Sequence, residues 1–374
     1  FSYRVFYEKR IKRILPNLIL LLVAVSIVGY FFLFPQEYKN LGHQVYTSAS
    51  FLQNFRLLKS VGYFTEEALH QPLLHLWSLA IEEQFYIVFP ILCAVLWRFS
   101  RRSVKTLGIF VFLITTGSLL ACLLVQDRNF AFYFPLTRFW ELGVGILLAY
   151  SETFDSDRQT QRFSLGFRHS LSIAGLICIV LPMLCYADRF AHPGLITLLP
   201  VLGATSIIAA QPSAIVNRTI LSWRPMTFVG LISYSLYLWH WPLLSFLFIC
   251  IPDPSFKSIL LALIISFVIA SLVYFFVENP IRRSKLNSTT ISLLLLIALA
   301  AVYVCGKQIR AQDGLPNRNF SGALSEVKDA LDWIPELSLP TLGNSSLSQL
   351  KVIDAADFPP LVFAGDSHTE QYYF

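Results

Sequence analysis

The sequence predicts an all-α polytopic membrane bundle, and three observations support this fold class. Of the 374 residues, 55% are hydrophobic and only 14% are charged, whereas soluble domains contain about 25% charged residues. The mean hydropathy is +0.59. Apolar stretches of roughly 20 residues, the length that crosses a bilayer as a helix, recur along the chain up to about residue 306.

Nine stretches have the length and apolarity of spanning helices. Some are imperfect: Arg138 and Glu141 lie near the start of one, and only a short polar turn separates two others. After about residue 307 the chain becomes polar, and Asp313 and Gly314 indicate a loop. The predicted spans are 14–34, 74–97, 106–125, 132–150, 170–187, 193–210, 226–250, 257–277 and 288–306.

The distribution of Lys and Arg predicts the side that each loop faces, because cytoplasmic loops are enriched in both. With the N-terminus in the cytoplasm, the inner loops hold well over half of the 29 Lys and Arg residues, and every inner loop contributes. An N-in, C-out topology follows, with the polar tail outside the cytoplasm. The net charge of +6 then reflects loop topology and gives no indication of nucleic-acid binding.

The cysteines indicate neither a metal site nor structural disulfides. All six fall in apolar stretches, and none has the spacing of metal ligands. We therefore expect no metal and no tightly bound cofactor. The six are Cys93, Cys122, Cys178, Cys185, Cys250 and Cys305.

The stretch LHQPLLHLWSLAIEEQFYIVFP, residues 69–90, carries unusual polar groups into an apolar segment. At 100° per residue, His75, Ser78, Glu82 and Tyr86 share one stripe, and Glu83 lies beside it. A carboxylate in a bilayer helix costs about 2.5 kcal/mol or more. Either this helix end is wetted at the interface, or the carboxylates face a polar site inside the bundle, in which case Glu82 and Glu83 are catalytic candidates.

The N-terminal FYEKRIKRILP places five basic residues before the first apolar run. Positive-inside anchoring accounts for such a cluster in any first loop. The alternative is a cradle for a phosphate-bearing cytosolic donor, because Arg groups bind phosphate with two parallel hydrogen bonds.

One further motif has two competing interpretations. In ISYSLYLWHWP, Ser233, Tyr237 and His240 share a helical stripe just before Pro242. These side chains belong either to an outer aromatic belt or to the lining of a glycan site.

Two predicted ion pairs favour structural roles. Arg138 and Glu141 are three residues apart and can pair on one helix. Glu278, beside Arg282 and Arg283, is expected to cap a helix or form a local ion pair.

Near the C-terminus, PPLVFAGDSH predicts a short strand that ends in a tight turn. The turn presents the hydroxyl of Ser367, which is a nucleophile candidate. A serine nucleophile needs a base and an oxyanion hole, and the adjacent His368 is not the expected base.

Five motifs in this order resemble the acyltransferase-3 family, membrane O-acyltransferases of the O-antigen acetylase type. The resemblance covers residues 1 to about 286, and PPLVFAGDSHTEQYY is similar to the first block of an SGNH-type esterase domain. The five motifs are FYEKRIKRILP, HLWSLAIEEQFYIVFP, TRFWELGVGILLA, ISYSLYLWHWPL and YFFVENPIRR.

The resemblance implies transfer of an acyl group, usually acetyl, from cytosolic acyl-CoA to a hydroxyl of an extracytoplasmic or lipid-linked glycan. Candidate glycans are lipopolysaccharide O-antigen, exopolysaccharide and peptidoglycan. The family's Arg-x-x-Arg motif corresponds to Arg10 and Arg13, which are expected to serve the acyl-CoA. His75, Tyr86, Tyr237 and His240 are expected to line the acceptor site or its cavity.

One departure from the family pattern concerns its first helices, which carry an Arg and a presumed catalytic His about eleven residues apart. Those helices are not found in this sequence, so we expect a fragment that is cut at both ends and inactive alone. The acyltransferase and SGNH pairing implies location in the bacterial cytoplasmic (inner) membrane, in contact with lipid.

The expected organisation is an acyltransferase domain at 1–286, a further spanning helix at 287–306, a linker or periplasmic extension at 307–355 and the start of an α/β SGNH domain at 356–374. A transporter or flippase for a lipid-linked glycan is the alternative function, since it too needs a polar-lined bundle. No inverted repeat, which many transporters contain, is evident in the sequence.

Overall fold

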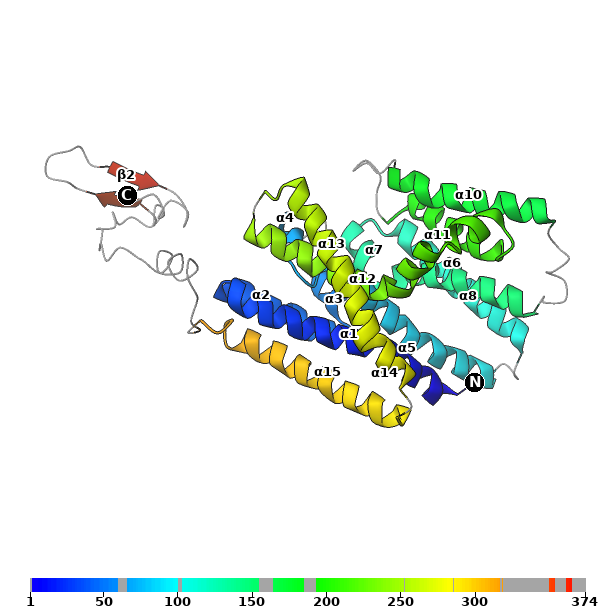
Figure 1. Cartoon of the computed structure of the whole chain (residues 1–374), viewed down its shortest axis with the longest axis horizontal. Helices are drawn as coiled ribbons and strands as arrows, with labels where there is room; N and C mark the ends of the chain where they lie inside the picture. The colour runs from blue at the N-terminus through cyan, green and yellow to red at the C-terminus, as the bar shows by residue number, and fades with distance from the viewer. Residues whose placement is uncertain are drawn as a thin grey trace. The chain divides into compact units, whose positions relative to one another are not determined.

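A computed structural model of the chain is almost entirely helical in the part that it describes (Figure 1). Two units are formed, one from Phe1 to Arg318 and one from Asn319 to Phe374. The described residues are 2–59, 66–99, 103–154, 164–184, 193–251, 253–284, 286–316, 318, 350–353 and 361–364.

The first unit contains long helices linked by short ones. The long helices are α1 (Tyr3–Phe32), α5 (Leu76–Phe99), α6 (Val104–Leu124), α10 (Leu165–Leu184), α12 (Arg224–Cys250), α13 (Phe256–Val273) and α15 (Ser288–Ala311). The shorter helices are α2 (Pro35–Ala49), α3 (Gln53–Leu58), α4 (Glu66–Leu69), α7 (Arg128–Tyr133), α8 (Phe139–Phe154), α11 (Leu198–Ala209) and α14 (Asn279–Arg283). Single turns of 3₁₀ helix at Pro135–Thr137 and Leu195–Thr197, and of π helix at Asn217–Leu221 and Tyr274–Glu278, complete the unit.

Seven helices of the described residues are long and apolar enough to cross a membrane, so the chain is a multi-pass membrane protein. The prediction of nine spans is not confirmed. The segment predicted at 132–150 is divided at Pro135, which starts a 3₁₀ turn between α7 and α8, and α8 has only 16 residues. The segment predicted at 193–210 forms a helical stretch of Leu195–Ala209 only.

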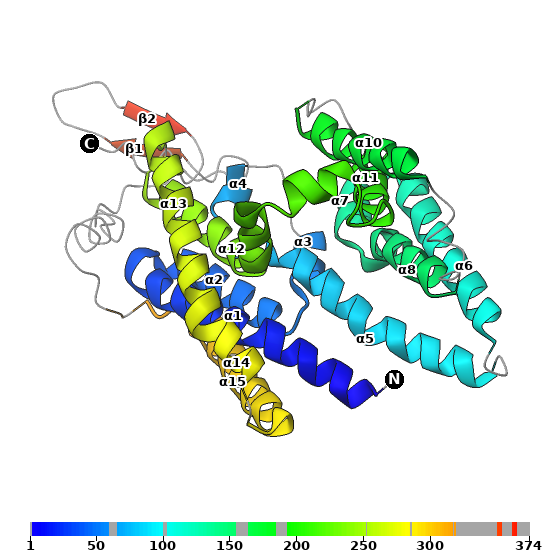
Figure 2. The same cartoon turned by 45° about the vertical axis from the view of Figure 1, so that its right-hand side comes forward.

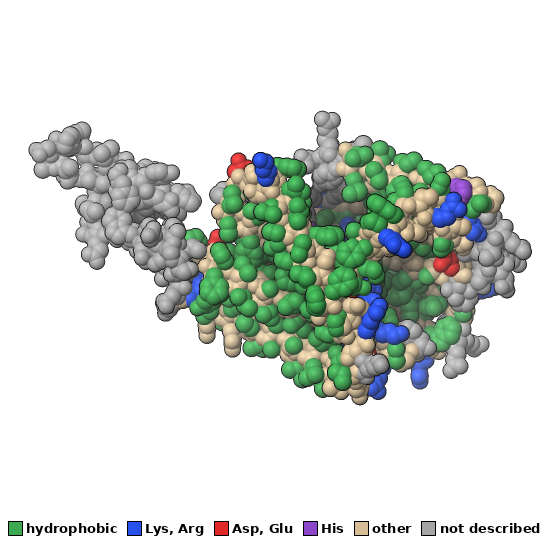
Figure 3. All heavy atoms as spheres, viewed as in Figure 1, with side chains coloured by type: hydrophobic (Ala, Val, Ile, Leu, Met, Phe, Trp, Pro, Cys, Tyr) green, Lys and Arg blue, Asp and Glu red, His purple; other side chains and the backbone are tan. Residues whose placement is uncertain are grey.

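The two helices found where longer spans were predicted, α8 and α11, each pack against a long helix. α8 packs against α6, and α11 packs against α10. Figure 2 shows these four helices gathered on one side of the unit, with α1, α12, α13 and α15 on the other and α5 between them. Much of the surface in Figure 3 consists of hydrophobic side chains, which suits contact with lipid.

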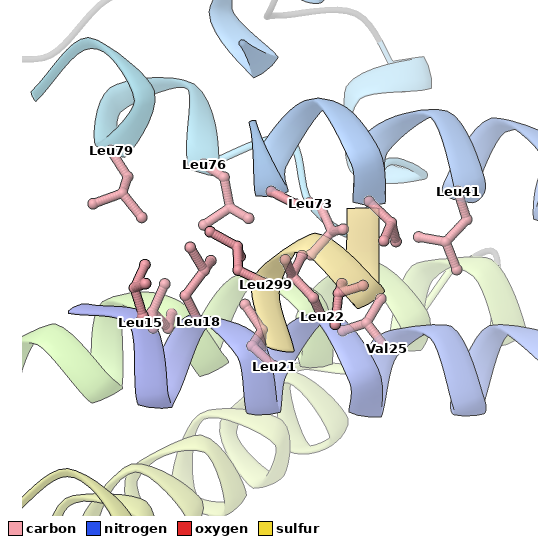
Figure 4. Close-up of a cluster of buried hydrophobic side chains, with 14 of the residues drawn as sticks. Leu15, Leu18, Leu21, Leu22, Val25, Leu41, Leu73, Leu76, Leu79 and Leu299 are labelled. Carbon is pink, nitrogen blue, oxygen red and sulfur yellow. The ribbon is translucent and has the colours of Figure 1, made fainter. Parts of the chain in front are cut away.

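The core of the unit surrounds α1, where Leu18, Leu21 and Leu22 have no exposed surface. Figure 4 shows these side chains meeting Leu73, which precedes α5, and Leu299 of α15. A segment outside the regular helices thus reaches the centre of the bundle.

α2 turns back along α15 after α1 ends. Lys39 pairs with Asp313 at 2.8 Å, and further along α2 the ring of Tyr46 meets that of Tyr303. Between these contacts Gly42 lies against Gly306. Small residues let helices approach closely in membranes. Here Gly42 and Gly306 allow the polar helix α2 to pack closely against the apolar helix α15.

In the second unit, β1 (Leu350–Ile353) pairs with β2 (Leu361–Ala364) in an antiparallel ladder. β2 confirms the strand predicted from LVFAG. Ser367 and the expected SGNH turn lie outside the described residues.

The close approach of α2 and α15 makes Gly306 sensitive to substitution. A Cβ atom there would lie 2.8 Å from Val45 Cγ1 and 2.9 Å from Tyr46 N. Gly306→Ala should therefore reduce the free energy of unfolding by about 1–3 kcal/mol, measured as a lower thermal midpoint in detergent.

Gly117→Ala on α6 is the matched control, because no described neighbour lies within 4 Å of an added Cβ there. Its midpoint should stay level or rise, since Ala favours helix over Gly. Equal midpoints for Gly306→Ala and Gly117→Ala would contradict close packing of α2 on α15.

Candidate active site

Arg10 of α1 and the carboxylates of α5 form an ion-pair cluster. An Arg10 guanidinium nitrogen lies 2.5 Å from Glu83 Oε1 and 3.6 Å from Glu82 Oε1. The guanidinium carbon lies 3.3 Å from the centre of the Tyr86 ring, so the group is stacked on that ring. Arg10 Nε is buried and has no hydrogen-bond partner among the described residues. The cluster therefore holds an oriented cation with an unused donor.

The two carboxylates are not equivalent. The side chain of Glu83 is 12% exposed, whereas that of Glu82 is 45% exposed. The predicted stripe of His75, Ser78, Glu82 and Tyr86 meets Arg10 through Glu82 and Tyr86, and Glu83 beside the stripe makes the shorter contact. Wetting at a helix end fits Glu82, and a site inside the bundle fits Glu83.

Arg13 lies one turn further along α1 and has an exposed side chain. It is close enough to Glu278 for its charge to act on that carboxylate. The two arginines of the Arg-x-x-Arg motif thus face different acidic partners, Arg10 on α5 and Arg13 at the end of the π turn.

A buried polar network links α1, α12 and the π turn. Asn17 Nδ2 donates to Ser235 Oγ at 2.6 Å, and Ser235 Oγ donates to Glu278 Oε2 at 3.1 Å. Arg282 lies 3.6 Å from the other Glu278 oxygen, which confirms the predicted local ion pair. Asn17 and Ser235 were missed by the sequence reasoning. The isolated amide in the apolar run ILPNLILLLV was the signal that could have found Asn17.

The segment before α5 is held by side chains of α12. Tyr237 donates to the carbonyl of His75, Trp241 Nε1 donates to that of Gln71 at 3.0 Å, and Ser245 donates to that of Leu69 at 2.6 Å. The three donors are four residues apart and share one face of α12. We call residues 69–75 the entry segment and these contacts the α12 ladder.

The other side of the entry segment is held by α2 and α3. Gln44 Oε1 accepts from the backbone N–H of Leu73 at 2.9 Å, and Gln53 Nε2 donates to its carbonyl at 3.4 Å. Arg56 donates to Gln71 Oε1 at 2.9 Å. Side-chain amides thus replace the missing helical hydrogen bonds of buried backbone.

His75 lies at the end of the entry segment with its side chain buried. Its ring centre is 5.1 Å from that of Tyr237 and 5.8 Å from that of His240. Neither ring nitrogen of His75 has a hydrogen-bond partner among the described residues. The rings of His75, Tyr237 and His240 therefore lie together, with that of His75 buried and the other two half-buried.

Other predicted residues are found elsewhere. Ser233 is exposed, and among the described residues its hydroxyl donates only to the Gly230 carbonyl of its own helix, so it does not join Tyr237. Tyr86 lies beneath Arg10 and not among the His75 rings. Arg138 and Glu141 pair at 3.0 Å, as predicted. No group of His, Cys, Asp or Glu in the described ranges could hold a metal ion.

Comparison with known proteins decides the family. Residues 1–278 match the family described as "Acyltransferase domain", which is most of the chain. The chain belongs to this acyltransferase family. No solved structure matches the chain.

Curated relatives of the acyltransferase include "Peptidoglycan O-acetyltransferase OatA" of Listeria monocytogenes, 29% identical over 290 residues, or 75% of this chain and 46% of the relative. YrhL of Bacillus subtilis is 30% identical over 304 residues, or 77% of this chain and 47% of the relative. "O-acetyltransferase OatA" of Staphylococcus aureus is 29% identical over 290 residues, or 74% of this chain and 47% of the relative. The chain thus spans about half the length of these relatives.

Removal of one donor of the α12 ladder tests its contribution. Tyr237→Phe keeps the ring but leaves the His75 carbonyl without this donor, and it should destabilise the acyltransferase by about 1 kcal/mol. The measurement is the thermal midpoint in detergent. Ser233→Ala, on the exposed face of the same helix, is the control; a midpoint as low as that of Tyr237→Phe would argue against the ladder.

Proposed function

We propose that the chain is the membrane part of an O-acetyltransferase that modifies a cell-wall polysaccharide. The acyl group, acetyl, comes from cytosolic acetyl-CoA and ends on a glycan hydroxyl. Membership of the acyltransferase family and the names of the Listeria and Staphylococcus relatives support this proposal. Those relatives favour peptidoglycan over lipopolysaccharide O-antigen as the acceptor.

The observation that carries the proposal is the Arg10 cluster. The basic N-terminal segment contains an arginine, Arg10, that is stacked on Tyr86, paired with Glu83 and left with an unused donor at Nε. An oriented guanidinium is suited to bind the phosphates of a nucleotide-bearing donor. Arg13, exposed one turn away, supplies a second cation to the same ligand.

The reaction breaks the thioester C–S bond and forms an ester C–O bond to the glycan. The hydroxyl proton must pass to a base, because a neutral hydroxyl is a poor nucleophile. The coenzyme thiolate leaves and takes a proton. Glu83 is paired with the Arg10 guanidinium, so we assign Glu83 the role of orienting Arg10. The Tyr86 ring supports the same guanidinium. We assign Glu82 no contact with the donor.

The proposed setting is the bacterial cytoplasmic membrane with the basic N-terminus in the cytosol. The donor then reaches Arg10 from inside, and the tail after α15 lies outside. Ser367, in the tail, is proposed to belong to an SGNH-type domain and to relay the acyl group. Its hydroxyl loses a proton and takes the acyl group as an ester. The glycan hydroxyl then forms its own ester, the C–O bond to Ser367 breaks, and the serine regains a proton.

The role of Glu83 is tested in the full-length protein. Glu83→Gln removes the charge that holds Arg10, so acetyl transfer to the glycan should fall by about 10² or more, with a raised KM for acetyl-CoA. Acetylated glycan is measured in membranes of cells that lack the native enzyme.

Glu82→Gln is the matched control, because Glu82 is the neighbouring carboxylate, is 45% exposed and lies 3.6 Å from Arg10, further away than Glu83. Its activity should stay within a few-fold of wild type. Equal losses in the two variants would remove the distinction between them, and full activity of Glu83→Gln would remove the Arg10 cluster from the donor site.

Ser367→Ala tests the second transfer step. Acetylated glycan should fall to background, and coenzyme A should be released only as fast as water takes the acyl group, with acetate as the product. Full glycan acetylation by Ser367→Ala would indicate that the membrane domain acylates the glycan directly.

A further inference from the structure

A polar cavity lies at the opposite end of α1 from Arg10. It has a volume of about 400 Å³ and is lined by residues 33–44 around the start of α2, by Arg56 of α3, by residues 70–72 of the entry segment and by Ile249 at the end of α12. The helix from Arg10 to Phe32 rises by roughly 33 Å, about the thickness of the hydrocarbon core. The cavity and the Arg10 cluster thus lie near opposite faces of the membrane.

Three of the six polar side chains that line this cavity are amides, and His70 is among the other three. The amides belong to Asn40, Gln44 and Gln71, and Arg56 and Glu37 add one charge of each sign. Amides both donate and accept hydrogen bonds, as sugar hydroxyls and acetamido groups do. Pro72 offers an apolar surface for the C–H face of a ring. This lining matches a neutral sugar better than a phosphate, which would leave the amide oxygens facing an anion.

The polar groups are held in place before any ligand arrives. Gln44 is fixed by the N–H of Leu73, and Arg56 by Gln71 Oε1. Glu37 accepts from the backbone N–H of Phe34 at 2.9 Å. Burial, aided by the charge of Arg310, lowers the pKa of Arg56 to about 10, so the group stays protonated at neutral pH. Such preformed groups are typical of ligand sites.

Part of the cavity lining belongs to the entry segment, which leads to the centre of the bundle. Gln71 and Pro72 belong to the entry segment, whose α12 ladder includes the bond from Trp241 to the Gln71 carbonyl. The same segment ends at His75, whose ring nitrogens have no partner among the described residues. A ligand in the cavity therefore touches the segment that leads to the half-buried rings of Tyr237 and His240.

We propose that this cavity binds the acceptor, a neutral sugar unit with free hydroxyls, and that Asn40, Arg56 and Gln71 recognise it. This inference rests on the function proposed above, because it assigns the acceptor side of that reaction.

The experiment uses the full-length protein in nanodiscs and a β-1,4-linked N-acetylglucosamine oligosaccharide as probe. Asn40 has an exposed side chain that makes no hydrogen bond with the other described residues. Asn40→Ala should raise the acceptor KM about tenfold and leave the KM for acetyl-CoA unchanged. Arg56→Gln should act in the same direction. Lys59→Gln, an exposed cation at the end of α3, is the control and should leave both constants unchanged.

Direct binding of the oligosaccharide, measured by calorimetry without acetyl-CoA, separates this inference from the proposed function. Binding that Asn40→Ala weakens supports the cavity even if no acetyl transfer is detected, which would count against the proposed function alone. An unchanged acceptor KM and unchanged binding in Asn40→Ala overturn the inference. Binding of inorganic phosphate in place of the sugar, or equal loss of donor and acceptor use with a lowered thermal midpoint, overturns it as well.

Discussion

The structure depends on satisfying the backbone of a non-helical stretch inside an apolar bundle. In a membrane protein such backbone is tolerated only where protein or a water-filled cavity supplies its hydrogen bonds. The entry segment obtains them from two directions, from the α12 ladder on one side and from Gln44 and Gln53 on the other. One requirement thereby fixes α2, α3, α5 and α12 relative to one another.

This arrangement gives the bundle a polar site near each end, with the hydrogen-bonded entry segment between them. Arg10 and Glu83 occupy one end, and the amide-lined cavity occupies the other. The entry segment and α5 are contiguous in sequence and reach from one to the other. At about 1.5 Å per residue, Glu83 lies roughly 12 Å along the helix from His75. An acyl group would have only a short distance to cross between the donor side and the buried rings.

Sequence reasoning succeeded where a property is local. Long apolar runs predicted the long helices, and i, i+3 or i, i+4 spacing predicted the pairs of Arg138 with Glu141 and Glu278 with Arg282. It failed where partners are distant in the chain. A helical wheel cannot say which face of α5 meets α1, so the closer pairing of Arg10 with Glu83 than with Glu82 could not be predicted. The shortening of two predicted spans depends on Pro135 and on packing against α6 and α10, which hydropathy does not report.

The position of α2 between α1 and α15 has a consequence for biosynthesis. α2, with the sequence PQEYKNLGHQVYTSA, is too polar to remain among lipid tails, and its close partner α15 begins about 240 residues later. At about 5–20 residues per second, the ribosome needs roughly 12 to 50 seconds to supply that partner. Until then α2 must stay at the membrane surface or be sheltered by an insertion factor, so the order of translation sets the moment at which the bundle can close.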